Sequence, residues 1–168
     1  MLGGGMSTDR PPIGRYFMPV KLGVYKSAAE LRQAVSASGK KINKYADQIL
    51  NKITVSPKEI ELDLYEVSVR ELGFTSSASR ENIYKRAFKH GFKKCPAEVG
   101  PLARIQCDEE KMRIIGMDQL TAGGFRSVRS VFELRNDGDD LQLYAANDGP
   151  DLWLIPDHVL VWVWPRRK

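Results

Sequence analysis

Residues 79–107, SRENIYKRAFKHGFKKCPAEVGPLARIQC, constrain the fold more than any other part of the chain. Ser79 is a suitable N-cap, because its hydroxyl can accept a hydrogen bond from an unpaired N–H of a first helical turn. Gly91 can adopt the left-handed conformation that ends many helices. Apolar side chains recur between these two residues at helical spacing: Ile83, Tyr84, Ala87 and Phe88. Pro96 and Pro101 restrict the residues before them to extended or turn geometry, so the stretch predicts a helix followed by a stiff corner.

The chain changes character at this corner. Residues 102–107, LARIQC, can alternate between two faces, so we expect a strand with Arg104 on its less apolar side. Before the corner the apolar residues recur mostly at helical spacing, and after it they follow the alternation and turn residues of strands. The sequence therefore predicts a helical half followed by a β half.

The N-terminal half predicts two helices. Residues 1–21 hold four glycines and three prolines without periodicity, and we expect them to form a disordered or loosely attached arm. Ser27 and Glu30 form a capping box that starts a helix ending at Gly39. A second amphipathic helix is expected over residues 40–53. Two helices joined at a glycine predict a helical hairpin or a helix-turn-helix.

Strand patterns fill most of the rest. Residues 59–69 alternate between an apolar and an acidic face, and shorter runs at 112–118, 128–135 and 141–145 are separated by turn residues. Residues 159–164, VLVWVW, are apolar on both faces and are expected inside the sheet. We therefore expect an α+β fold: an N-terminal helical hairpin, one strand and one helix, then a five-stranded antiparallel sheet that could curl into a small barrel.

The length of 168 residues fits one domain with a substantial core. We assign residues 22–168 to a single α+β domain, with a mainly helical half over 22–92 and a β half over 93–168. The longest apolar run has six residues, far short of a membrane span. No basic segment precedes an apolar one at the start, so we expect no secretory signal, and Met6 could be the natural start. The two cysteines form no disulfide framework, which favours a cytoplasmic location.

The charge is unevenly distributed along the chain. Residues 1–60 hold ten Lys/Arg and four Asp/Glu, whereas residues 108–168 hold eight and eleven. Lys40, Lys41 and Lys44 crowd the start of the second expected helix, where a helix-turn-helix protein contacts DNA. They could equally be the solvated end of a helix that only packs. The pattern points to a nucleic acid or an acidic protein as the partner.

Few residues are suited to catalysis or metal binding. Cys95, Cys107, His90 and His158 show neither a CxxC nor an HxxxH pair, so we expect no metal site and no cofactor. A thiol enzyme could use Cys95 with a histidine and Glu98 as its orienting group. Cys107 fits a buried apolar thiol better. We assign no catalytic residue from the sequence.

Three further residues are candidates for binding. Glu98 can hold the proline-bounded turn by accepting hydrogen bonds from backbone N–H groups, and Arg104 can pair with it. Trp153 follows a loop and is the tryptophan that we expect to be partly exposed, so it could stack on a base of single-stranded nucleic acid. Trp162 and Trp164 lie in the doubly apolar run and are expected in the core.

The order of several motifs resembles a family of uncharacterised small bacterial proteins. The shared pieces are a helix of SAAELRQA type, ELGF at residues 71–74, CPAEVGP at 95–101, and a β-rich tail with a Trp-Leu pair at 153–154. The resemblance implies no known function.

The sequence thus favours a non-enzymatic binding module with a basic helical face. A small Cys95-dependent enzyme and a homodimeric protein–protein interaction module remain the alternatives.

Overall fold

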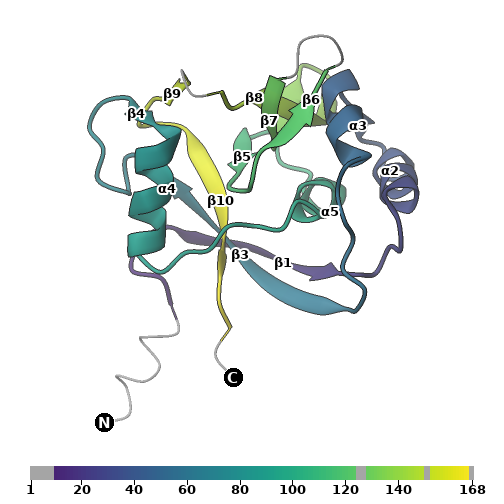
Figure 1. Ribbon diagram of the computed structural model, residues 1–168, viewed down its shortest axis with the longest axis horizontal. Helices are drawn as coiled ribbons and strands as arrows, with labels where there is room; N and C mark the ends of the chain where they lie inside the picture. The colour runs from purple at the N-terminus through teal and green to yellow at the C-terminus, as the bar shows by residue number, and fades with distance from the viewer. Residues whose placement is uncertain (1–9, 124–127, 150–151, 167–168) are drawn as a thin grey trace.

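The computed structural model describes residues 10–123, 128–149 and 152–166. The fold is α+β and is built on a mixed, largely antiparallel sheet of eight strands (Figure 1). The strand order is β1-β3-β10-β5-β7-β8-β2, and β6 pairs with β7 outside this path. The bounds are β1 (Arg15–Leu22), β2 (Lys41–Ile42), β3 (Ile60–Ser68), β5 (Arg113–Ile115), β6 (Leu120–Ala122), β7 (Val128–Asp137), β8 (Asp140–Asn147) and β10 (Val159–Trp164). A separate ribbon pairs β4 (Ala78–Ser79) with β9 (Trp153–Leu154).

Helices cover both faces of the sheet (Figure 1). On one face lies α4 (Arg80–Lys89), whose Tyr84 ring meets the Trp162 ring of β10 edge to face at 4.9 Å between centroids. On the other face lie α2 (Ala28–Ala37), α3 (Lys44–Leu50) and α5 (Val99–Gln106). There α5 approaches β7 so closely that a Cβ at Gly100 would lie 2.5 Å from the Phe132 ring. The core therefore has two layers, one on each side of β10.

The doubly apolar run forms the interior of the sheet, as its pattern predicts. β10 pairs antiparallel with β3 and parallel with β5, and its first five residues are buried. Side chains on both of its faces are covered because helices lie on both sides of the sheet. No helix among the described residues has the length and apolar character needed to cross a bilayer.

The expected barrel and the five-stranded antiparallel sheet are wrong. The sheet is open, with β1 at one edge and β2 at the other, and it includes two parallel pairings, β10 with β5 and β2 with β8. The β half does not make a sheet of its own, because β10 pairs with β3 from the N-terminal half. Alternation within each strand gave no information on which strands would pair.

Part of the predicted N-terminal arm is a strand. Residues 15–22 form β1, which pairs antiparallel with β3 from Arg15 to Leu22. Val20 and Leu22 are buried in the core, which holds the strand in place despite Pro19 within it. The first nine residues of the predicted arm lie outside the described residues.

The predicted helical hairpin is also wrong. Gly39 ends the first helix with a positive φ, but residues 41–42 then pair with β8 as a short strand. Asn43 is the N-cap of the next helix, because its side chain accepts hydrogen bonds from the backbone N–H groups of Tyr45 and Ala46. The second helix therefore begins at Lys44 and not at Lys40, and α2 and α3 are separated by a strand of the sheet.

The predicted strand at residues 102–107 is a helix, α5. Val99, Leu102 and Ala103 have the spacing of one helical face, and all three are buried. Pro101 lies in the first turn, where a missing backbone N–H costs no intrahelical hydrogen bond. The pattern of residues 102–107 fits both the two-residue repeat of a strand and the 3.6-residue repeat of a helix. Packing against β7 favours the helix.

Candidate functional site

The three predicted lysines do not form one surface patch. Lys40 is buried, and its Nζ donates to the Ile105 carbonyl at 3.1 Å and to Asp108 Oδ1 at 2.6 Å. Lys41 Nζ lies 3.7 Å from Asp140, and Lys44 is exposed beside the ring of Tyr45. The basic surface that the sequence suggested at this helix start is therefore reduced to exposed Lys44 and ion-paired Lys41.

Glu98 and Arg104 are both buried, and they do not pair with each other. The Glu98 carboxylate accepts hydrogen bonds from the backbone N–H groups of Gly23 at 2.8 Å and Ser56 at 2.9 Å. Arg104 donates to the carbonyls of Cys107 at 2.5 Å and Gln142 at 3.3 Å. These contacts hold loops and strands in place and leave neither side chain available to a ligand.

The cysteine site lacks the geometry of a nucleophile. Cys95 is buried, and its Sγ lies 3.4 Å from the Val161 carbonyl. Burial raises the pKa of this thiol, which disfavours the thiolate that a nucleophile needs. His90 Nδ1 lies 2.9 Å from the Arg86 carbonyl within its own helix end. No group of three or more potential metal ligands occurs in the described part of the chain.

A hollow along α4 brings together cationic and aromatic side chains that the sequence analysis did not group. This α4 pocket has a volume of about 400 Å³. Its lining residues come from α4 and from loops and strands that face it: Ser79, Arg80, Glu81, Tyr84, Lys85, Phe88, Lys94, Gln119, Arg129 and Gly149. Four of them are cationic and one is acidic, so the lining carries a net positive charge.

One wall of the pocket is a face of α4. Tyr84 and Lys85 lie three and four residues after Glu81 and four and three before Phe88, which places the four side chains on the same side of a helix. Ser79 caps this helix by accepting from the N–H of Asn82. The α4 wall is thus fixed by its cap at one end and by the packing of Tyr84 on Trp162.

The inner part of the pocket is held by an ion pair. Arg80 Nε donates to Asp148, Arg80 Nη2 donates to the Met117 carbonyl at 2.7 Å, and the guanidinium lies 3.8 Å from the centre of the Tyr84 ring. Gln119 also donates to Asp148. Burial raises the pKa of Asp148 more than Arg80 and Gln119 lower it. Arg80 is therefore committed to the fold, and its charge is largely balanced.

The other three cations are exposed, and two of them are ion-paired. Lys85 lies 3.6 Å from Glu81, and Lys94 lies 2.5 Å from Asp118, with the four side chains partly or largely exposed. Arg129 is exposed, and no carboxylate of the described residues lies within ion-pair distance of it. Exposed ion pairs contribute only about 0–1 kcal/mol, so a multivalent anion can compete for these lysines.

Two exposed aromatic side chains flank the pocket. Phe88, on the α4 wall, is 44% exposed, and Trp153 is 57% exposed. Trp153 lies opposite Ser79 in the β4–β9 ribbon, which places it beside the N-terminal end of α4. The pocket therefore combines exposed cations with aromatic rings that are partly open to solvent.

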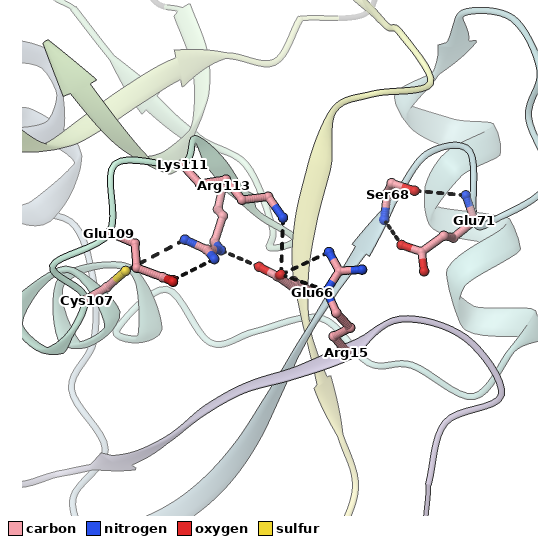
Figure 2. Close-up of polar contacts among 8 residues, drawn as sticks. All are labelled: Arg15, Glu66, Ser68, Glu71, Cys107, Glu109, Lys111 and Arg113. Carbon is pink, nitrogen blue, oxygen red and sulfur yellow. Dashed lines mark hydrogen bonds and ion pairs between the residues drawn. The ribbon is translucent and has the colours of Figure 1, made fainter. Parts of the chain in front are cut away.

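A second charged cluster surrounds Glu66, which is buried together with Arg113, whereas Arg15 and Lys111 are partly exposed. Figure 2 shows Arg15, Lys111 and Arg113 pointing toward the Glu66 carboxylate. Arg15 Nη2 lies 3.1 Å and Lys111 Nζ 3.2 Å from Oε1, and Arg113 Nε donates to Oε2. Arg113 also donates to Glu109 at 2.8 Å. The cluster ties β1, β3 and β5 together, and Glu66 occupies the position that an anionic ligand would need.

Sequence reasoning missed the α4 pocket for a clear reason. Lys85, Lys94 and Arg129 lie far apart in the sequence and share no motif. The cations come from three separate segments that meet only in the folded chain. Trp153 was the one residue near the pocket that its sequence context marked as exposed.

Comparison of the chain with protein-family models, curated proteins and solved structures gives no match. The resemblance drawn from the motif order therefore stays a prediction, and any function must be argued from the site itself.

Proposed function

We propose that this protein is a non-enzymatic module that binds single-stranded nucleic acid at the α4 pocket. The observation that carries the proposal is the meeting of Lys85, Lys94 and Arg129 with the exposed ring of Phe88 in one pocket. The exposed Trp153 lies beside this pocket, at the strand position opposite Ser79. Proteins that bind single strands combine cations that follow the phosphates with aromatic side chains on which bases stack.

The aromatic side chains favour a single strand over a duplex. In a duplex the base faces are stacked on one another and cannot reach Phe88 or Trp153, whereas unpaired bases can. A purely acidic protein would use the lysines but would leave the rings without a matching planar partner. The basic helical face that the sequence suggested is thus reassigned from Lys40, Lys41 and Lys44 to α4 and its neighbours.

The proposal is tested by fluorescence anisotropy with a labelled twelve-nucleotide RNA and its DNA counterpart, titrated with the full chain from low to physiological salt. We expect binding that weakens linearly on a log–log plot, with a slope of about −0.7 for each phosphate neutralised. An unlabelled duplex of the same length is expected to compete less well than the single strand.

Charge-reversal variants locate the site. Lys85→Glu combined with Lys94→Glu is expected to weaken binding at least tenfold, because both cations lie on the proposed phosphate path. Lys26→Glu combined with Lys58→Glu is the matched control, since both lysines are exposed, both lie outside the pocket, and the change in net charge is the same. Equal losses in both variants would show that only net charge matters, and would refute the site.

The aromatic variants separate the strand from other polyanions. Trp153→Ala and Phe88→Ala are each expected to weaken single-strand binding, since stacking on one base contributes about 1–3 kcal/mol. Neither should change binding of poly-glutamate, which has no bases. Tighter binding of poly-glutamate than of the oligonucleotides would favour an acidic protein partner instead.

A further inference from the structure

A second hollow lies on the opposite face of the sheet from the α4 pocket. This α3 pocket has a volume of about 490 Å³ and lies between α3 and strands β6, β7 and β8. Alternation along β7 separates the two pockets: Val128 and Ser130 line the α3 pocket, whereas Arg129 between them lines the α4 pocket. The two sites therefore use different side chains of the same strand.

The α3 pocket exists because its floor is made of small residues. Ala122 of β6, Ser130 of β7 and Ala145 of β8 all line it, and all three are buried. Larger side chains at these strand positions would reach α3 and fill the space, as interiors are normally close-packed. The surrounding core is closely packed elsewhere, with Phe132 and Leu143 fully buried in the same strands.

The walls of this pocket are fixed by hydrogen bonds. Gln48 Oε1 accepts from the backbone N–H of Gly123 at 2.5 Å, and Lys52 Nζ donates to the Thr121 carbonyl at 2.5 Å. Asn43 caps the start of α3. These contacts fasten α3 to β6, so the hollow is a property of the folded chain and needs no ligand to open it.

The mouth of the pocket has a cation beside an aromatic ring. Tyr45 is 49% exposed, and Lys44 Nζ lies 5.9 Å from the centre of its ring. No carboxylate of the described residues lies within ion-pair distance of Lys44. Asn147 accepts from Gly149 N through its Oδ1, which leaves its side-chain NH₂ group to donate. Donors and positive charge thus surround a partly apolar hollow.

From this arrangement we propose that the α3 pocket binds a small aromatic carboxylate. The ring lies over Ala122 and Ala145 against Tyr45, and the carboxylate faces Lys44. The volume is within the range of small-molecule sites, about 300–1,000 Å³, and admits one or two fused rings. This site is independent of the α4 pocket and of the function proposed for it.

The probe for the test is 1-naphthoate, with 1-naphthamide as its uncharged match, titrated into the ¹⁵N-labelled full chain and followed by NMR. We expect saturable shifts of the amides of Tyr45, Ala122 and Ala145 with naphthoate, and weaker binding of the amide. The Lys85→Glu, Lys94→Glu double variant is expected to bind naphthoate as the wild type does, because those residues line the other pocket.

Two variants test the residues. Lys44→Gln is expected to weaken naphthoate binding about fivefold and to leave naphthamide unchanged, as loss of one exposed charge pair predicts. Ala145→Leu is expected to lower the affinity for both probes more than tenfold, because the larger side chain fills the floor of the pocket. The NMR spectrum of this variant reports whether the fold is kept. Should that variant unfold, Tyr45→Ala, an exposed position, replaces it with the same expectation.

Absence of shifts at several millimolar naphthoate would overturn the proposal, as would shifts clustered away from α3 and β6. Equal affinity of the wild type and Lys44→Gln for naphthoate would also overturn the assignment of the carboxylate. Oligonucleotide binding can succeed or fail without changing any of these readings.

Discussion

Glu66 and Glu133 are both buried in the sheet, yet their pKa values move in opposite directions. Burial raises the pKa of Glu66, but the hydrogen bonds and charges of Arg113 and Lys111 outweigh it and leave the pKa below its usual value. Burial also raises the pKa of Glu133, and its one cationic partner, Arg135, does not compensate. The balance between burial and the cations around each carboxylate decides the direction of its pKa shift.

For Glu66, the consequence is acid sensitivity. Its pKa is lower in the folded protein than the ordinary 4.5, so ionised Glu66 stabilises the fold above that pH, and the contribution is lost as pH falls through the lower folded value. We expect Glu66→Gln to lower the free energy of unfolding by about 2–4 kcal/mol at neutral pH. Urea denaturation from pH 3 to 7 measures it, and the variant should lose less stability than the wild type on acidification.

For Glu133, the sign is reversed. Its pKa is higher in the folded protein, so its stabilising contribution is present at low pH and is lost as pH rises through the raised folded value. Glu133→Gln is expected to be neutral or stabilising at pH 7, since Arg135 keeps its contact with the Tyr144 ring. The same urea series, with Glu66→Gln as the matched comparison, checks this. A loss at pH 7 as large as that of Glu66→Gln would contradict it.

The burial of Cys95 predicts how fast its thiol reacts. Its thiol is buried and its pKa raised by that burial, so iodoacetamide should label it only when the chain opens. We expect labelling of the native protein at neutral pH to be at least a hundredfold slower than in urea, measured by mass spectrometry. Rapid labelling of native Cys95 would restore the thiol-enzyme alternative.

At the start of α5, one buried side chain connects the helix to two distant loops. Glu98 precedes the helix and accepts hydrogen bonds from two loops, at Gly23 and at Ser56. The carboxylate satisfies two backbone N–H groups that lie far from each other in the sequence. It therefore joins the end of β1, the start of β3 and the helix between the sheet and α2.

Removing that carboxylate should loosen all three elements. Glu98→Ala is expected to lower the free energy of unfolding by about 2–4 kcal/mol, because it leaves buried N–H groups without acceptors. Glu98→Gln should cost less, since its one amide oxygen still serves one of the two donors. Chemical denaturation measures both, with hydrogen exchange of Gly23 and Ser56 as the local readout. A cost below about 0.5 kcal/mol for the alanine variant would contradict this role.

Elements with a local start signal could be predicted from the sequence. Ser27 and Ser79 both cap helices as expected, and the alternation of residues 59–69 corresponds to β3. Elements decided by long-range packing could not. The residues of α5 fit two periods, and β2 is a two-residue strand that exists only through its pairing with β8.

The candidate sites follow the same division. The lysine run at residues 40–44 is a local signal, and the fold buries one of its members and pairs another. The α4 pocket draws cations from segments that the sequence keeps apart, such as Lys85 and Arg129. A surface assembled by topology leaves no pattern in any one window of the chain.

At the scale of the whole molecule, β10 connects the two halves. It lies between β3 and β5, and it is the last of the described strands in chain order. Its first five residues are buried, with Val161 and Trp162 fully so. Without β10, the pair of strands β1 and β3 would not be joined to β5 and the rest of the sheet.

A truncation series tests this dependence. A chain ending at residue 156 is expected to show no cooperative unfolding transition by circular dichroism, because the centre of the sheet is missing. A chain ending at Trp164 is the control: it loses Arg166, whose pairs with Glu61 and Asp63 are exposed and contribute little. A cooperative transition in the shorter chain would show that the two parts fold without β10.

The place of β10 in the chain order also bears on how the protein is made. While a ribosome is still adding residues, β1 and β3 can pair, but the other edge of β3, at Leu64 and Val67, has no β10 to pair with. Synthesis must pass Trp164 and clear the exit tunnel before the two layers can close on each other. Until then the nascent chain exposes apolar strand surface, which is what holding chaperones bind.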